Sequence, residues 1–88
     1  MQLKTLTASW CSSCKTMKSI WSAISREYPS VNFNFLDCTN DDGIALSYDT
    51  DTLPALLVVD EENKILGRLI GINHKDIVID FLKKYNFI

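Results

Sequence analysis

The chain is poor in residues that bend or cross-link a backbone: its 88 residues include three glycines, two prolines and three cysteines. These low numbers exclude a collagen-like repeat, a low-complexity disordered tail and a disulfide-dense mini-scaffold. Hydrophobic residues make up 47% of the chain and charged residues 23%, which is ordinary for a globular protein. A chain of this length has room for one core, so we expect a single domain over residues 1–88.

An excess of positive charge and a long apolar run are also missing. Nine Lys and Arg stand against eleven Asp and Glu, and no basic stripe is visible, so nucleic acid is not expected as a direct ligand. No run approaches the roughly 20 apolar residues of a membrane span. The first residues, 1–4, lack the basic region and apolar core of a signal peptide. We therefore expect a cytoplasmic protein. Because that compartment is reducing, the three cysteines are not expected to form a structural disulfide framework. We expect the protein to be a monomer.

Hydrophobic periodicity predicts seven elements in the order β-α-β-α-β-β-α. Apolar residues recur every three or four positions after Cys11, which predicts a helix over 11–28 that Pro29 ends. Strands are expected over 2–8, 31–36, 56–59 and 64–70, the third buried on both faces. Further helices are expected over 40–48 and after residue 73. The resulting fold class is α/β, with a right-handed βαβ unit and a four-stranded mixed sheet flanked by helices on both faces.

Polar residues are expected to begin the two later helices. Asn40 is a candidate N-cap for the helix over 40–48. Asn73 with Asp76 resembles a capping box for the last helix. The apolar face of that last helix is expected to comprise Ile77, Val78, Phe81, Leu82 and Tyr85.

The segment Trp10-Cys11-Ser12-Ser13-Cys14 carries the clearest chemical signal. It follows a predicted strand and opens a predicted helix, where unsatisfied N–H groups and the helix dipole favour the thiolate of Cys11. Cys14 lies one turn further along, close enough to form a disulfide with Cys11, and its burial would raise its pKa. Cys11 is therefore the expected nucleophile and Cys14 the expected resolving thiol.

Two other interpretations fit the cysteine pair. A structural zinc site needs four ligands, so it would require both Cys38 and His74 at an unusual spacing. An inert structural pair is the second alternative. Cys38 itself is expected to be a small buried hydrophobe rather than a regulatory or glutathione-accepting thiol, and His74 a solvated residue at the start of the last helix.

Three segments together resemble the thioredoxin superfamily. Residues 10–15 resemble its active-site segment, Leu53-Pro54-Ala55 resembles its cis-proline loop, and Ile70-Gly71-Ile72 resembles the glycine turn bordering its substrate groove. The resemblance covers nearly the whole chain in the correct order. It implies a cis bond before Pro54, with the backbone of Leu53 presented to an extended substrate peptide.

The chain departs from ordinary thioredoxins in three ways. It begins at the strand that leads into the cysteines, without the strand and helix that usually precede it, so we expect the minimal core of glutaredoxins and some short thioredoxins. Ser12 and Ser13 replace the usual Gly-Pro between the cysteines, so the turn is more flexible and the reduction potential should differ. Thr5 occupies the position of a buried acid that is thought to help deprotonate the second cysteine.

The resemblance implies an enzyme that reduces protein disulfides through a Cys11–Cys14 cycle. Its substrate-binding rim would comprise Trp10, Ser12, Ser13, Leu53, Pro54, Gly71 and Ile72. No cofactor or metal is implied, and the recycling partner would be thioredoxin reductase with NADPH.

Two rival functions are kept open. In the first, the protein is a glutaredoxin recycled by glutathione, whose carboxylates would need a basic cluster such as Lys15, Lys18 and Lys75. Asp49 and Asp51 would oppose such an anion. In the second, it is a non-catalytic thioredoxin-like subunit of a larger complex. A variant that lacks both Cys11 and Cys14 would then keep its function.

Overall fold

The computed structural model describes the backbone of residues 1–88 and every side chain except that of Asp42. Its elements are β1 (Gln2–Thr7), α1 (Ser12–Glu27), β2 (Phe33–Asp37), α2 (Asp42–Ser47), β3 (Ala55–Val59), β4 (Ile65–Ile70) and α3 (Lys75–Lys84). This order confirms the β-α-β-α-β-β-α prediction. The ends of the elements differ from the predicted ends by a few residues.

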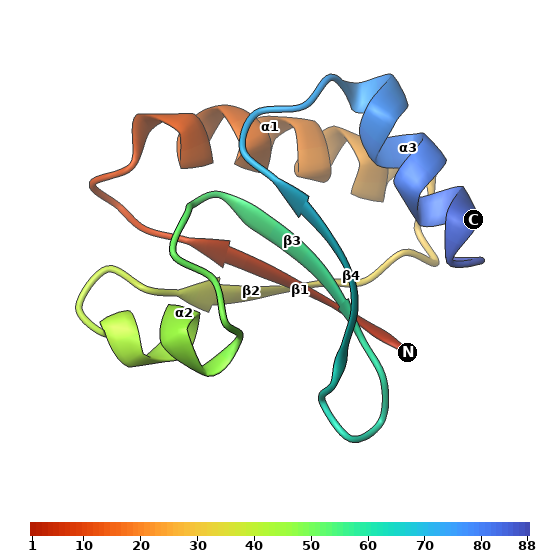
Figure 1. The fold of residues 1–88 in the computed structure, drawn as a ribbon. Coiled ribbons are helices and arrows are strands. Elements are labelled where there is room, and N and C mark those ends of the chain that lie inside the picture. Colours follow the sequence, from red (N-terminus) through yellow and green to blue (C-terminus); the bar gives the residue numbers. More distant parts are fainter.

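The four strands form one mixed sheet in the order β2-β1-β3-β4 (Figure 1). β1 and β2 are parallel and are joined through α1, whereas β3 is antiparallel to both β1 and β4. Leu6 of β1 pairs with Ala55 of β3, which pairs with Ile70 of β4. The last residues of β1 and β4 and the first of β3 therefore meet at one end of the sheet.

Helices cover both faces of the sheet, as predicted, with α1 and α3 on one side and α2 on the other (Figure 1). The core under α1 and α3 comprises Leu3, Met17, Trp21, Ile24, Val31, Phe33, Leu56, Val58, Val78 and Leu82. The core on the α2 side comprises Leu6, Cys38, Ala55, Leu57 and Val59. Every residue of β3 is buried, because its side chains alternate between the two cores.

The start of α2 corrects one predicted cap. The N-cap is Asp41 rather than Asn40, because the Asp41 carboxylate accepts the Gly43 N–H at 2.9 Å. This bond satisfies one of the N–H groups that have no partner within the helix.

The start of α3 corrects the second predicted cap. His74 is the N-cap, is exposed, and makes no side-chain capping bond, so the predicted capping box of Asn73 and Asp76 is wrong. The Asn73 side-chain amide is used elsewhere, since it donates to the carbonyls of Ile70 and Gly71. It thereby braces the turn that leaves β4.

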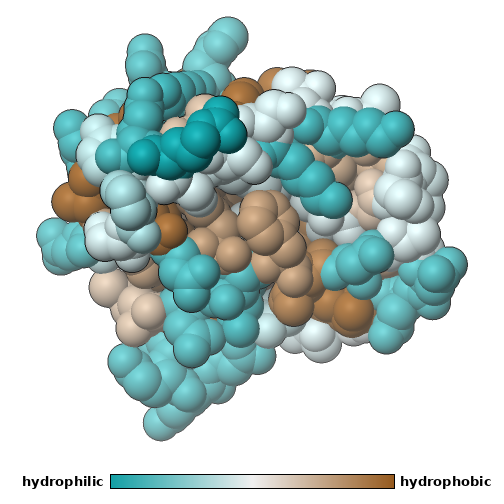
Figure 2. Space-filling view, turned by 180° about the vertical axis from the view of Figure 1, so that it is seen from behind, coloured by the Kyte–Doolittle hydropathy of each residue, from teal (hydrophilic) through white to brown (hydrophobic). Residues whose placement is uncertain are grey.

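Two large apolar side chains lie further out than a buried face would place them. Val78 and Leu82 point into the core, and Ile77 lies about 100° around the helix from Val78, so it is 46% exposed and its predicted burial is wrong. Phe35 is 49% exposed because β2 is an edge strand, although its ring still contacts Trp21. Apolar side chains remain visible in the middle of the face seen from behind, between hydrophilic margins (Figure 2).

Tyr85, just after α3, closes the structure over β4. Its hydroxyl donates to the carbonyl of Leu66 at 3.1 Å, and its ring contacts Phe81 with a centroid separation of 5.2 Å. This close approach of Tyr85 to β4 requires glycine at position 67, because a Cβ there would lie 2.2 Å from the Tyr85 hydroxyl oxygen.

Candidate active site

The loop between β1 and α1 places the two cysteines one helical turn apart. Cys11 is the N-cap of α1, and its sulfur accepts the backbone N–H of Cys14 at 3.3 Å. Cys11 is partly exposed, whereas Cys14 is 1% exposed. Ser12 and Ser13 occupy the first two positions of the helix between them. The arrangement presents one sulfur to solvent and keeps the other directly behind it.

Cys14 is held in its protonated form. Burial and, to a lesser extent, a hydrogen bond with the Cys11 side chain raise its pKa from 9.0 to about 11. A hydrogen bond with the Ala8 backbone and, to a lesser extent, the charge on Lys18 one turn further along α1 lower the pKa but are outweighed. The sequence-based expectation of a raised pKa at Cys14 is therefore confirmed.

Thr39, which was not predicted as a site residue, fixes the loop that carries Trp10. The indole N–H of Trp10 donates to the Thr39 carbonyl at 3.3 Å, and the Ser9 N–H donates to the Thr39 hydroxyl oxygen at 2.9 Å. The hydroxyl of Thr39 in turn donates to the Asp37 carboxylate, which also accepts the Thr39 N–H at 2.9 Å. These bonds hold the pKa of Asp37 below its usual range.

The sequence contained no local signal that Thr39 holds the Trp10 loop, because Ser9 and Trp10 lie about 30 positions from Thr39. Parallel pairing of Thr7 with Asp37 brings the two loops together at the ends of β1 and β2. Trp10 itself is 66% exposed, so the network positions an indole that faces solvent.

The Leu53–Pro54 segment lies at the same end of the sheet, and its peptide bond is cis, as the resemblance implied. Pro54 is buried and Leu53 is half-buried. The carbonyl of Pro54 accepts the N–H of Gly71 at 2.8 Å, which joins the two loops. Gly71 has φ = 82°, a backbone conformation that favours glycine, and the following Ile72 is 60% exposed.

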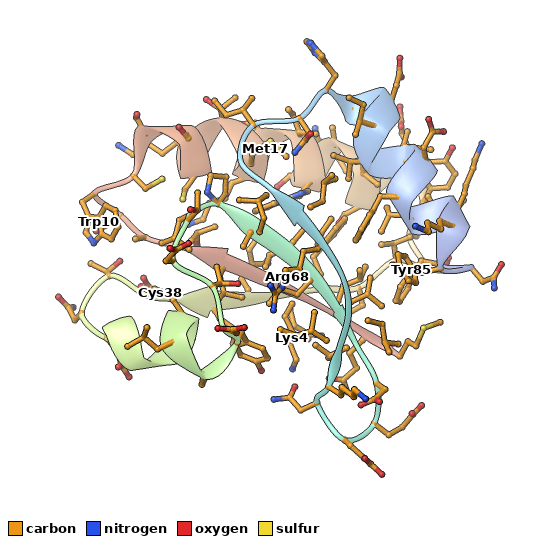
Figure 3. All side chains as sticks on the ribbon, in the orientation of Figure 1. Lys4, Trp10, Met17, Cys38, Arg68 and Tyr85 are labelled. Atoms are coloured by element: carbon orange, nitrogen blue, oxygen red, sulfur yellow. The ribbon has the colours of Figure 1, made fainter. Side chains whose placement is uncertain are left out.

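Met17 connects that second loop to the cysteine-bearing helix. The Asn73 N–H donates to the Met17 sulfur at 3.4 Å, and Figure 3 shows Met17 on α1 behind the segment that leads from β4 to α3. The sheet register thus brings together three of the predicted segments: the cysteine loop, the proline loop and the glycine turn.

Thr5 is fully buried beneath the site, in β1. Its hydroxyl donates to the carbonyl of Asn34 in β2 at 3.1 Å. The hydroxyl proton is therefore committed to the neighbouring strand.

Cys38 and His74 do not join the cysteine pair. Cys38 is buried on the α2 side, as expected of a small hydrophobe, and His74 is exposed at the start of α3. Among the described side chains, no group of three or more His, Cys, Asp or Glu could hold a metal ion. No helix within the described part of the chain has the length and hydropathy needed to cross a membrane.

A family model of thioredoxin matches residues 2–84. The chain belongs to the thioredoxin family. A thioredoxin from Chlamydia trachomatis is 27% identical over 78 residues, which are 89% of this chain and 76% of the relative. A thioredoxin H-type 2 from Nicotiana tabacum is 28% identical over 65 residues, which are 74% of this chain and 54% of that protein.

Solved structures of thioredoxins have the same fold as this thioredoxin-family chain. The thioredoxin of Trypanosoma brucei brucei superposes with a TM-score of 0.79 at 28% identity, over 96% of this chain and 73% of that one. Thioredoxin f2 of Chlamydomonas reinhardtii has a TM-score of 0.81 at 15% identity, over 98% and 79% of the two chains. Family membership supports thiol–disulfide oxidoreductase chemistry in general.

Proposed function

We propose that this protein reduces disulfide bonds in other proteins through a Cys11–Cys14 dithiol cycle. The observation that carries the proposal is the division between the two thiols. Cys11 is partly exposed at the start of α1, whereas Cys14 is buried directly behind it with a pKa of about 11. A nucleophile must be reachable, and a resolving thiol must stay idle until a mixed disulfide has formed.

The cycle transfers two electrons and two protons to the client. The Cys11 thiolate attacks one sulfur of the client disulfide, so a Cys11–client bond forms and the client S–S bond breaks. The released client sulfur takes up a proton. Cys14 then loses its proton and attacks the Cys11 sulfur, which releases the second client thiol and leaves a Cys11–Cys14 disulfide.

The residues around the cysteines would bind the client. Trp10 and Ile72 supply exposed apolar surface, Ser12 and Ser13 supply hydroxyl groups, and Leu53 offers backbone groups to an extended peptide, with the buried Pro54 beneath them. The tight turn at Gly71 keeps that loop close to Pro54, through the 2.8 Å bond between them. No metal or bound cofactor takes part in these steps.

Insulin reduction with two recycling systems tests the proposal. One contains NADPH with thioredoxin reductase, the other NADPH with glutathione reductase and glutathione. We expect turnover with the first. Turnover with only the second would support a glutaredoxin function instead. Turnover with neither would contradict both the thioredoxin and the glutaredoxin function, unless chemically reduced protein still reduces insulin.

Two matched variants test the roles of the cysteines. Cys14→Ser should form a stable mixed disulfide with insulin, because nothing resolves it, whereas Cys11→Ser should form none. Electrophoresis without reductant distinguishes the two outcomes. Trapping by Cys11→Ser instead would reverse the assigned roles.

A further inference from the structure

A pocket of about 500 Å³ opens beside Trp10, on the α2 side of the cysteines. We call it the Trp10 pocket. Its apolar lining comprises Trp10, Cys38, Ala45, Leu46 and Leu53. Figure 3 shows Trp10 and Cys38 at the same end of the molecule, next to α2. Its volume lies within the range of about 300–1,000 Å³ that is usual for small-ligand sites, so it has room for a large apolar side chain.

Two of the apolar side chains that line the Trp10 pocket are exposed to solvent. Trp10 and Leu46, on its walls, are 66% and 70% exposed. Leu53, which also lines it, directly precedes Pro54. A client peptide that pairs with the backbone of Leu53 would therefore pass the mouth of the pocket within a residue or two of its attacked cysteine.

One carboxylate, that of Asp51, lies at the rim of the Trp10 pocket. Asp51 lines the pocket, is exposed, and accepts a hydrogen bond from the Thr52 hydroxyl at 3.2 Å. Arg68 pairs instead with Asp49 at 3.8 Å, and Asp51 takes part in none of the ion pairs among the described side chains. Asp51 can therefore pair with a cation that a client brings.

The charge of the surrounding chain has the same sign. Residues 28–63 include eight of the eleven acidic residues and none of the nine Lys and Arg residues: the acids are Asp37, Asp41, Asp42, Asp49, Asp51, Asp60, Glu61 and Glu62. The basic residues nearest to the cysteines in sequence, Lys15 and Lys18, belong to α1. The segment that supplies α2 and the proline loop is therefore acidic, whereas the helix that carries the cysteines is basic.

We propose that the Trp10 pocket selects clients in which an apolar side chain and a neighbouring lysine or arginine lie within a residue or two of the attacked cysteine. The apolar side chain enters the pocket and the cation pairs with Asp51. This proposal rests on the disulfide reductase function proposed above and names its substrate class: disulfides in basic, apolar segments. An acidic segment would meet like charge at the same rim.

Single-turnover reduction of matched peptides tests this selectivity without a recycling enzyme. Three peptides of equal length, each with one internal disulfide, carry Leu-Lys, Leu-Glu or Gly-Lys on both sides of each cysteine. Chemically reduced protein is mixed with each peptide, and the reaction is quenched with acid and separated by chromatography. Rates with dithiothreitol on the same peptides correct for differences in intrinsic disulfide reactivity.

The corrected rates should favour Leu-Lys over both other peptides. Asp51→Asn should reduce the preference for Lys over Glu by about two- to fivefold, as expected for loss of one exposed ion pair. Asp80→Asn makes the same change of charge on α3 and should leave the preference unchanged. Salt at about 0.5 M should weaken the preference in the wild type. Leu46→Ala should reduce the preference for Leu over Gly by about twofold or more.

The outcomes separate this proposal from the function on which it rests. Equal corrected rates for all three peptides would refute the selectivity but leave the reductase function standing. An equal effect of Asp51→Asn and Asp80→Asn would also refute it, because net charge rather than the pocket would then be responsible. Failure to reduce any peptide would refute the reductase function and the selectivity together.

Discussion

Removal of the Cys14 thiol should change how the stability of the protein depends on pH. Burial holds the pKa of Cys14 at about 11 in the folded protein, against an ordinary value of 9.0 in the unfolded chain. Above pH 9 the unfolded chain loses this proton first, so ionisation favours unfolding. The contribution of the protonated Cys14 thiol to stability is fully present below pH 9 and is lost as the pH rises to about 11. A difference of two pKa units amounts to about 2–3 kcal/mol.

Urea unfolding of the wild type and Cys14→Ala between pH 8 and 11 measures this effect. A reductant is kept present so that no disulfide forms. Cys14→Ala loses packing at every pH, but the gap between its free energy of unfolding and that of the wild type should shrink by about 2–3 kcal/mol across the range. Lysine and tyrosine titrations affect both proteins and cancel in the comparison.

Met17→Ala is the matched control for this experiment. Met17 is as buried as Cys14 and lies on the same side of α1, but it has no proton to lose. Its destabilisation should therefore be constant between pH 8 and 11. A constant gap for Cys14→Ala as well would show that the Cys14 thiol ionises as readily in the folded protein as in the unfolded chain, and the assigned resting state of the resolving thiol would be refuted.

Three further predictions concern other positions. Gly67→Ala should lower the free energy of unfolding by about 1–3 kcal/mol, because the new methyl group displaces Tyr85. In a Tyr85→Ala background the same substitution should leave the free energy of unfolding unchanged. An equal loss of stability in both backgrounds would show that Gly67 is not required by a clash with Tyr85. Thr39→Val should alter the tryptophan fluorescence and raise the KM for a disulfide client more than it lowers kcat. Thr39→Ser, which keeps a hydroxyl group that can donate to Asp37, should restore the wild-type fluorescence and KM. If Thr39→Ser does not restore them, the hydroxyl group does not position Trp10. Thr5→Asp should change the pH dependence of mixed-disulfide resolution in quenched single turnovers, and an unaltered profile would count against a role for this position.

Much of the fold could be predicted because it depends on local periodicity. The change of apolar spacing after Cys11 predicts α1, and the apolar run at 56–59 predicts a strand covered on both faces. Helix caps were less predictable, because neighbouring polar residues compete for the same N–H groups. Asp41 caps α2 where Asn40 was expected, and Asn73 braces the preceding turn where a cap was expected.

The sequence by itself determined the order of the elements, the position of the cysteine pair at the start of a helix, and the acidic character of residues 28–63. Each of these follows from the spacing or composition of neighbouring residues, so no knowledge of distant contacts is needed. Only the tertiary structure decided which distant groups meet. Parallel pairing of β1 with β2 brings Thr39 to the indole of Trp10, and α2 packs beside them to leave the Trp10 pocket. Such contacts depend on strand register and on the packing of helices, which no short stretch of sequence records.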